Sequence, residues 1–406
     1  MSIQQPLIRT AGREFEFMCL AARLGFGSDE VARIRCLIGE GIDWPAFLAA
    51  VERNYVAPVA HRNLQSIEGS DIPAKVLDTM RVRSKLTAFK SELFATELVR
   101  LSQVFESKSI QTIHYKGAVT GQEYYGSVKL RNFNDLDFLV RRADLVALIE
   151  VLEAQGYRNS GKFTPEEFNH YVAEFKEFLF TRGEISLEPH WSLAGRRYPF
   201  ETDYEGLWRR SRMLAFRGTD LRVMCGEDSL LVLCLVGAKG RWQRLQMVTD
   251  VAACLRTYRD LDWASVAAMA RATGTVRILH LGLLLAADLA GAQLPEKLAR
   301  EVRKAGSLPQ LARQVVKSLA AASARPRFLP DSPAIFSPML FRQRERLRDR
   351  WHYLWHSTTT PEPHHMRRLP LPNVAFPLYR IFVPLHDFVM HPAWSLCKMV
   401  MTRAPR

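Results

Sequence analysis

The spacing of apolar residues changes along the chain, and this change most limits the folds that the sequence can adopt. Up to about residue 105, apolar side chains such as Phe15, Met18 and Cys19 recur every three or four positions, the period of amphipathic helices. From Ser109 they alternate with polar residues, which is typical of strands. The helical period returns at 228–322. We therefore predict an α+β protein in which helical regions flank a small mixed sheet.

The stretch from 109 to 191 contains the sheet that we predict. Its alternating, β-branched segments indicate strands, and Arg182-Gly183 is typical of a hairpin turn. Pro189 lacks the N–H that a central strand needs, so we expect pairing to stop there. The strands are expected at 109–115, 135–140, about 171–180 and 184–188, and the helices at 118–125 and 143–155.

The changes of pattern divide the chain into four expected parts. They are an N-terminal helical region at 1–108, an α/β core at 109–215, a helical domain at 216–325, and a basic, proline- and aromatic-rich C-terminal extension at 326–406. Within the extension, residues 379–390 would lie either on a membrane surface or on the protein body. Their broken helical period and Pro384 favour the protein body.

Charge and composition narrow the possible partners without choosing among them. The net charge of +14 favours anionic partners, namely nucleoside triphosphates, nucleic acid or an acidic membrane surface. The six cysteines include no CxxC pair, so neither a zinc site nor a redox motif is indicated. No secretory signal is visible, and the most apolar stretches, 230–238 and 278–287, are too short to span a bilayer. We expect a cytoplasmic protein without stable membrane insertion.

Asp135 and Asp137 are the first candidates for chemistry. Side chains two residues apart in a strand share a face, which leaves Leu136 and Phe138 to point toward a core. Two neighbouring carboxylates repel each other unless a cation lies between them, and carboxylate oxygens suit Mg²⁺. The alternative is a pair of solvated acids at a strand end.

Lys116-Gly117 stands where a strand passes into a short helix. The start of a helix offers free backbone N–H groups to a phosphate, and glycine lets the phosphate approach closely. A plain tight turn is the alternative.

Glu188 is a third acid that an adjacent strand could bring beside the aspartate pair. It would then ligate a metal or take a proton from an acceptor hydroxyl, whereas an exposed hairpin acid is the alternative. His190 would contact an acceptor or serve as a structural histidine, and the second role is favoured.

Several short segments together resemble the uncharacterised nucleotidyltransferase family of the polymerase-β-like superfamily. They are Lys116-Gly117-Ala118, Leu130-Arg131, residues 134–140, Gly156-Tyr157 and residues 187–191. The resemblance implies a nucleotidyltransferase core in which carboxylates bind one or two Mg²⁺ ions, an acceptor hydroxyl is activated, and an NTP is the co-substrate.

Carried over residue by residue, the resemblance implies a catalytic and metal-binding set of Asp135, Asp137 and Glu188. Ala118 departs from the Gly-Ser or Gly-Gly pair that is usual after the strand, so a serine contact to phosphate is missing. Basic residues at 239–244 replace a stretch that is often histidine-rich in the family; they would hold phosphates or an acidic acceptor, or form a solvated face. Asp250 matches a family acid of unknown role. The expected nucleotide-binding residues are Lys116, Gly117, Ala118, Arg131, Lys239 and Arg241.

Three functions fit these residues. The first is Mg-dependent transfer of a nucleoside monophosphate from an NTP to a hydroxyl-type acceptor, which would be a small molecule, a sugar, a peptide or RNA. The second is a non-catalytic protein that binds nucleotide or RNA on the same fold, and the third is a different group transferase that uses the same metal site.

Overall fold

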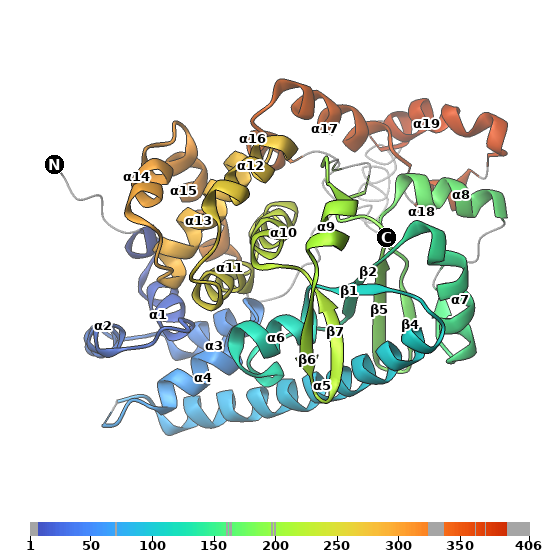
Figure 1. The fold of residues 1–406 in the computed structure, drawn as a ribbon. Coiled ribbons are helices and arrows are strands. Elements are labelled where there is room, and N and C mark those ends of the chain that lie inside the picture. The colour runs from blue at the N-terminus through green and yellow to red at the C-terminus, as the bar shows by residue number, and fades with distance from the viewer. Residues whose placement is uncertain are drawn as a thin grey trace, which may run out of the picture.

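A computed structural model describes residues 7–69, 71–159, 161, 165–195, 198, 200–323, 337–361, 363–369 and 371–387 (Figure 1). The description below concerns these residues. Residues 326–336, 362, 370 and 388–406 of the predicted C-terminal extension lie outside them.

Helices from the N-terminal part of the chain and from residues 226–323 form one helical body. The N-terminal helices and the later helices bury their apolar faces in a single hydrophobic core, and Figure 1 shows the blue and orange helices side by side. The N-terminal elements are η1 (Leu7–Thr10), α1 (Arg13–Ala21), α2 (Ser28–Gly39), α3 (Trp44–Arg53) and α4 (Ala57–Gln65). The later ones are α10 (Gly226–Lys239), α11 (Leu245–Thr257), α12 (Trp263–Thr273), α13 (Val276–Ala290), α14 (Glu296–Lys304) and α15 (Leu308–Ser323).

The long helix α5 (Ala74–Ser107) joins the helical body to the sheet. Its first part buries Val76 and Met80 in the helical core, whereas Phe94 and Leu101 lie in the core of the sheet. Figure 1 shows α5 running along one edge of the molecule past both parts. One continuous helix therefore contributes side chains to both cores.

The described strands form a seven-stranded mixed sheet in the order β3-β4-β5-β2-β1-β7-β6. The pair β2 and β5 and the pair β1 and β7 are parallel, and the other neighbouring strands are antiparallel. The strands are β1 (Thr112–His114), β2 (Leu136–Val140), β3 (Arg158–Asn159), β4 (Phe180–Arg182), β5 (Ile185–His190), β6 (Arg212–Phe216) and β7 (Thr219–Val223). The elements between them are α6 (Gly117–Tyr125), η2 (Val128–Leu130), η3 (Arg142–Asp144), α7 (Leu145–Ala154), α8 (Pro165–Glu174) and α9 (Tyr204–Arg210). The predicted α+β class with flanking helices is confirmed.

Alternation along the central strands separates core from site. Leu136, Phe138 and Val140 of β2 pack with α5 and α7 on one face of the sheet. Leu139 lies in a second cluster on the opposite face with residues of α9 and α10. Asp137 shares the facing of Leu139, because side chains alternate along a strand. Asp137 therefore lies on the side of the sheet that α10 covers.

Residues 171–180 do not form the strand that we predicted. Phe168, Tyr171 and Val172 follow the three- and four-residue steps of a helix and pack against the sheet core from α8. Strand β4 begins at Phe180. The aromatic and β-branched residues favoured a strand by composition, and their helical spacing decided the outcome.

Pairing does not stop at Pro189, contrary to our expectation. Pro189 lies opposite Phe138 within β5, which continues to His190. The carbonyl of Pro189 accepts a hydrogen bond from the N–H of Phe178 at 3.3 Å, so the side of the proline that lacks an N–H faces the chain just before β4 begins. The missing N–H therefore removes no hydrogen bond between β4 and β5.

The hairpin of β6 and β7 was not predicted. Arg217 and Gly218 form its turn with φ of 52° and 79°, the left-handed backbone that a two-residue hairpin turn uses. The hairpin adds two strands next to β1, so the boundary that we expected at 215 runs through β6.

The C-terminal extension packs on the body of the protein. The guanidinium of Arg344 lies 4.2 Å from the ring centroid of Tyr198, and the rings of His170 and Phe376 stack at 4.1 Å. Within the segment 379–390, whose docking we expected, the structure describes residues 379–387, and Tyr379 and Val383 are buried there. Its elements are α16 (Pro338–Arg342), α17 (Leu347–Thr359), α18 (Pro363–Arg368), η4 (Asn373–Leu378) and α19 (Tyr379–Leu385). Within the described chain, no helix has the length and apolar character needed to cross a membrane.

A buried ion pair joins the sheet to the helical body. Arg131 follows η2 and donates from Nε and Nη2 to the two carboxylate oxygens of Asp250 in α11, at 3.0 and 2.8 Å. The hydroxyl of Tyr125 in α6 donates to the same carboxylate at 2.7 Å. Both charged side chains are buried. The family acid Asp250 therefore has a structural partner.

We expect the substitution Asp250→Asn to lower the free energy of unfolding by about 3–5 kcal/mol, because it leaves the Arg131 guanidinium buried without a counter-charge. Chemical denaturation of the purified protein measures this loss. The control is Glu205→Gln, which removes a surface pair of 2.8 Å with Arg141 and should cost about 0–1 kcal/mol. Equal losses in the two variants would refute the structural role of Asp250.

Candidate functional site

The parallel pair β2 and β5 brings the acidic residues together. The strand register places Asp137 opposite Glu188, and Asp135 lies in the bend directly before β2, one residue short of the strand that we predicted at 135–140. The side-chain ligand atoms of Asp137, Glu188 and His190 all lie within 4.8 Å of one another. The carboxylates of Asp137 and Glu188 are also close enough to Asp135 to raise its pKa. The structure thus gathers the three acids that the sequence singled out.

Asp137 is the most buried of the three acids, with an exposed fraction of 6%. Its Oδ1 accepts a hydrogen bond from Nζ of Lys116 at 2.8 Å and lies 2.9 Å from Nε2 of His190. Burial alone would raise the pKa of Asp137, but Lys116 and His190 outweigh burial and hold the pKa below its ordinary value. Asp137 is therefore the acid that stays ionised.

The other two acids are shifted in the opposite direction. Burial, reinforced by the charges of Asp137 and Glu188, raises the pKa of Asp135 to about 7. Burial and the charge of Asp137 likewise raise the pKa of Glu188. Burial and the neighbouring carboxylates together outweigh the surrounding lysines at Asp135 and Glu188, and a bound cation would relieve this condition.

Two further lysines approach the acids from neighbouring elements. Lys239 ends α10 and lines a small cavity together with Lys116. Lys176 lies between α8 and β4. Burial, with the charge of Lys239 added, lowers the pKa of Lys176 to about 6, and burial with the charge of Lys116 lowers the pKa of Lys239 to about 8. Burial thus disfavours the charged forms of these two lysines, as it does those of Asp135 and Glu188.

His190 has a structural position next to the acids. Its Nδ1 lies 3.0 Å from Oε2 of Glu177, and its side chain is 1% exposed. Burial lowers the pKa of His190 to about 3, so the imidazole is neutral. A neutral ring that donates from Nε2 to Asp137 orients that carboxylate, in agreement with the favoured structural role.

Gly117 allows the helix α6 to begin against the acidic strand. Its φ of 61° is left-handed, and a Cβ at this position would lie 3.3 Å from the carbonyl oxygen of Asp135 and 3.6 Å from the ring of Phe133. Ala118 is buried beside it. A glycine is needed here both for the backbone angle and for the close approach. The start of α6 and the acids are consequently neighbours, joined by Lys116.

Arg131 and Arg241 are the remaining two residues that we predicted to bind nucleotide. The guanidinium of Arg131 is engaged by Asp250, so its role as a phosphate ligand remains a prediction. Arg241 lies in the left-handed turn after α10, with φ of 54°, two residues beyond Lys239. Its role also remains a prediction.

Lys176 and Glu177 were missed by the sequence reasoning. Their side chains form an ion pair with each other, and Glu177 approaches His190. The composition of 171–180 predicts a strand, whereas Lys176 and Glu177 lie in the loop between α8 and β4. No local pattern in the sequence marks them, because they reach the site only through the packing of these two elements.

A larger cavity lies away from the acids. It has a volume of about 640 Å³ and lies between the α1–α2 loop, α11 and the segment that follows α13, with Arg23, Arg256 and Trp263 in its walls. None of the three acids lines it. The converging charges of the acids and lysines therefore define the candidate site.

The fold and the site define the class of protein. A mixed sheet carries one acid on a central strand, a second acid directly before that strand and a third on the parallel neighbour, beside a glycine that begins a helix, as expected for a nucleotidyltransferase core. The chain belongs to the uncharacterised nucleotidyltransferase family, whose family model matches residues 40–291.

Other comparisons add little to this assignment. A solution structure of the antibiotic-resistance factor ANT(2'')-Ia is similar over 44% of this chain and 89% of that chain, with 12% identity and a TM-score of 0.30. So low a score carries no argument about this chain. No curated protein matches the sequence.

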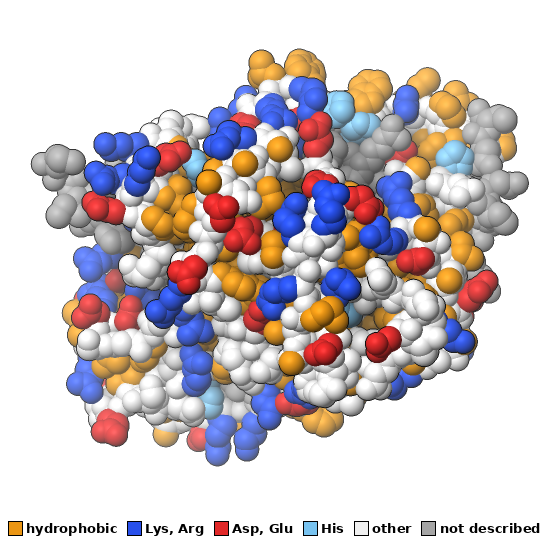
Figure 2. Space-filling view, viewed as in Figure 1, with side chains coloured by type: hydrophobic (Ala, Val, Ile, Leu, Met, Phe, Trp, Pro, Cys, Tyr) orange, Lys and Arg blue, Asp and Glu red, His pale blue; other side chains and the backbone are white. Residues whose placement is uncertain are grey.

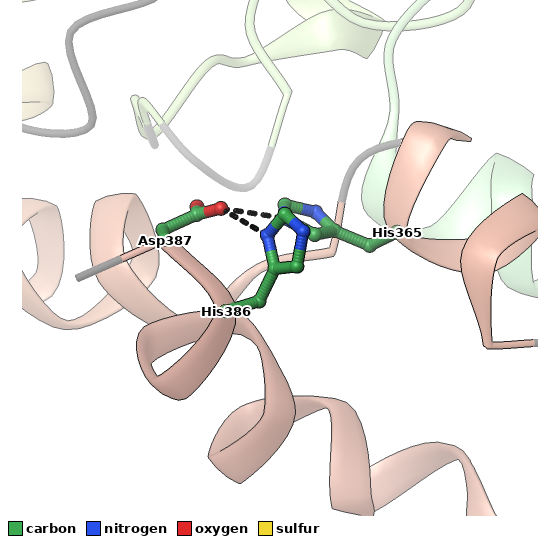
Figure 3. A group of neighbouring side chains, drawn as sticks. All are labelled: His365, His386 and Asp387. Carbon is green, nitrogen blue, oxygen red and sulfur yellow. Dashed lines mark hydrogen bonds and ion pairs between the residues drawn. The ribbon is translucent and has the colours of Figure 1, made fainter. Parts of the chain in front are cut away.

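His365, His386 and Asp387 form a second group of possible metal ligands, in the C-terminal extension (Figure 3). Nε2 of His365 and Nδ1 of His386 each lie 2.8 Å from Oδ1 of Asp387. Nη1 of Arg368 lies 2.8 Å from Nε2 of His386. Arginine only donates, so Nε2 of His386 accepts and its proton lies on Nδ1, facing Asp387. This network satisfies its members by hydrogen bonds, and we assign it a structural role that joins α18 to the end of α19.

The raised pKa of Asp135 predicts a pH-dependent stability. Above pH 7 the folded protein holds an unfavourable carboxylate, and as the pH falls toward 5 the folded state takes up a proton that the unfolded state does not yet bind. In metal-free buffer at pH 8, we expect Asp135→Asn to be more stable than the wild type by about 1–3 kcal/mol. The difference should shrink steadily as the pH is lowered to 5.

Urea unfolding at a series of pH values, with a chelator present, measures this difference. The control is Glu153→Gln, which changes an exposed acid of α7 and should show no such trend. A stability difference for Asp135→Asn that stays constant between pH 8 and 5 would contradict the crowding of the carboxylates.

Proposed function

We propose that the protein is a Mg²⁺-dependent nucleotidyltransferase that moves a nucleoside monophosphate from an NTP to a hydroxyl-type acceptor. The observation that carries the proposal is the opposition of Asp137 and Glu188 across parallel strands, with Asp135 alongside and the start of α6 next to them. Family membership supports the reaction class.

The donor set suits the metal that the family implies. Asp135, Asp137 and Glu188 offer carboxylate oxygens, which are the ligands that Mg²⁺ prefers. Both neighbours of Asp137 bond its Oδ1, and no hydrogen bond from a described residue reaches its Oδ2. When bound, Mg²⁺ would neutralise the triphosphate and lower the pKa of the acceptor hydroxyl.

The protein's own residues divide the remaining work. The acceptor oxygen forms a bond to the α-phosphorus, the bond from that phosphorus to the bridging oxygen of the β-phosphate breaks, and pyrophosphate leaves. Glu188 is partly exposed, with 29% of its side chain accessible, so an acceptor can reach it. Its raised pKa suits a group that takes the proton of the acceptor hydroxyl. His190 holds Asp137 in place throughout.

The triphosphate would lie against the start of α6 and the lysines. Backbone N–H groups at the start of a helix and the positive end of its dipole favour a phosphate. Lys116, Lys176 and Lys239 surround the same acids and would supply the compensating positive charges. The lowered pKa values of Lys176 and Lys239 would rise once an anion arrives, because a nearby negative charge favours the ammonium form.

A non-catalytic nucleotide-binding protein is the second candidate. Two observations favour it: Ala118 offers no hydroxyl to a phosphate, and Lys116 already places a positive charge on Asp137. Such a protein would bind nucleotide with little dependence on Mg²⁺. A different group transfer on the same metal site would instead move the γ-phosphate or another activated group.

The substitution Asp137→Asn tests the catalytic proposal. We expect Mg²⁺ to raise the melting temperature of the wild type in the presence of an NTP, since a ligand at a hundredfold excess over its Kd stabilises by about 2.7 kcal/mol. Asp137→Asn should lose the Mg²⁺-dependent part of this shift, and its rate of pyrophosphate release should fall by about 10³-fold or more, which corresponds to about 4 kcal/mol.

The matched control is Glu184→Gln, an exposed acid one residue before β5, which should behave as the wild type. Incorporation of label from α-labelled but not γ-labelled ATP into the acceptor distinguishes nucleotidyl from phosphoryl transfer. Full activity in Asp137→Asn would refute the proposal, and nucleotide binding without any pyrophosphate release, over a panel of acceptors, would favour the second candidate.

Lys176 generates a separate prediction about nucleotide affinity. Its pKa of about 6 in the nucleotide-free protein means that binding of a triphosphate takes up a proton between pH 6 and 8, so affinity should fall as the pH rises through this range. Lys176→Met should weaken binding by about 10- to 100-fold, the value of a hydrogen bond to a charged group, and should flatten the pH dependence. Isothermal titration with Mg-ATP at several pH values measures both effects.

The control for this measurement is Lys85→Met, which removes an exposed lysine of α5. It should leave both the affinity and its pH dependence unchanged. An unchanged pH profile in Lys176→Met would show that another group takes up the proton.

A further inference from the structure

One side of α17 is apolar and open to solvent. Leu347, Trp351 and Trp355 are spaced four residues apart and are 69%, 68% and 54% exposed. The opposite side of the helix buries Tyr353 and Ser357 against the protein. Isolated exposed apolar residues are ordinary, but two tryptophans and a leucine along one helix form a continuous stripe.

The neighbouring helix presents a second stripe. Leu378 at the start of α19, together with Ile381 and Leu385 within it, is separated by helical steps, and the three are 53%, 68% and 50% exposed. Tyr379 and Val383 on the inner side are buried. Helices α17 and α19 pack on each other. Figure 1 shows both along one edge of the molecule, and Figure 2 shows hydrophobic side chains projecting there.

We call these six side chains the tail face. They are Leu347, Trp351, Trp355, Leu378, Ile381 and Leu385.

Positive charge surrounds the tail face. Residues 337–387 contain eight arginines and four acidic residues. Arg348 and Arg380 are exposed on the two helices that carry the apolar stripes, and Arg342 is exposed at the end of α16. Arg346 and Arg348 lie 3.8 and 2.6 Å from Glu201, and Arg348 also pairs with Asp349 at 3.4 Å, so the excess positive charge of the segment comes from its other arginines. The face therefore combines apolar area with a cationic surround.

We propose that the tail face lies on the surface of an anionic lipid bilayer. Tryptophan prefers the boundary between acyl chains and headgroups, and arginine attracts anionic headgroups. A helix with this composition lies in the plane of the interface and does not cross it. The proposal concerns where the enzyme works and is independent of the proposed reaction.

The two tryptophans distinguish the tail face from another exposed apolar surface and favour a lipid interface as its occupant. The apolar side chains Leu86 and Phe89 of α5 are equally exposed, at 66% and 75%. Basic residues also predominate beside them, with Lys85 and Lys90 against Glu92, but that surface has no tryptophan. It supplies a control of matched exposed apolar character and matched charge.

The test is flotation of the full-length protein with lipid vesicles. We expect binding to vesicles of phosphatidylcholine mixed with phosphatidylglycerol, much weaker binding to phosphatidylcholine alone, and loss of binding at high salt. The double variant Trp351→Ser/Trp355→Ser should bind anionic vesicles at least about tenfold more weakly, because each tryptophan buries apolar area worth more than a factor of ten.

Two further variants keep the result interpretable. Leu86→Ser/Phe89→Ser should bind as the wild type does. Arg348→Gln/Arg380→Gln, which leaves the apolar stripes intact, should weaken binding to anionic vesicles and reduce its salt dependence. Melting temperatures of all variants show whether the fold is retained.

The proposal is overturned if the wild-type protein does not bind anionic vesicles, or if the tryptophan variant binds them as well as the wild type does. It is also overturned if sedimentation shows a tryptophan-dependent dimer in place of vesicle binding, because the tail face would then be an interface between copies of this chain. Nucleotide binding serves as an independent readout, so failure of the nucleotidyltransferase proposal leaves this test unaffected.

Discussion

The buried carboxylate of Asp137 is the constraint on which the rest of the site depends. A carboxylate that is almost inaccessible to water requires positive charge and hydrogen-bond donors close by. Lys116 supplies the charge and His190 the donor. Lys116 can reach Asp137 because it directly precedes α6, and α6 can begin so close to β2 because residue 117 is a glycine. One buried charge thus accounts for the residue types at several neighbouring positions.

The ion pair between Arg131 and Asp250 extends this arrangement to the helical body. It fastens α11 to the segment that leads into β2, and α11 packs against α10, which ends in Lys239. The position of Lys239 beside the acids therefore depends on how the helical body is attached to the sheet. The ion pair thus ties a family acid that is far from β2 and β5 in sequence to the sheet in space.

Local patterns predicted the parts of the site that depend on neighbouring residues in the sequence. The two-residue period predicted that Asp137 and Phe138 point to opposite sides of a strand, and the glycine marked the start of α6, whereas Asp135 lies in the bend before β2. Patterns of this range gave no indication that β2 would pair with β5 in parallel, which is what sets Glu188 opposite Asp137. For the same reason Lys176 was missed: it reaches the acids only through long-range packing of α8 and β4.

The opposite pKa shifts of the acids and lysines have one cause. Burial discourages charge of either sign, so it raises the pKa of Asp135 and lowers that of Lys176 in the same site. A ligand with charge of only one sign would return the pKa values of either the acids or the lysines toward their ordinary values, but not both. A magnesium–triphosphate complex carries both signs on separate parts of one ligand, and on the proposed function its metal faces the carboxylates while its phosphates face the lysines. A single ligand would then favour the charged forms of both the acids and the lysines.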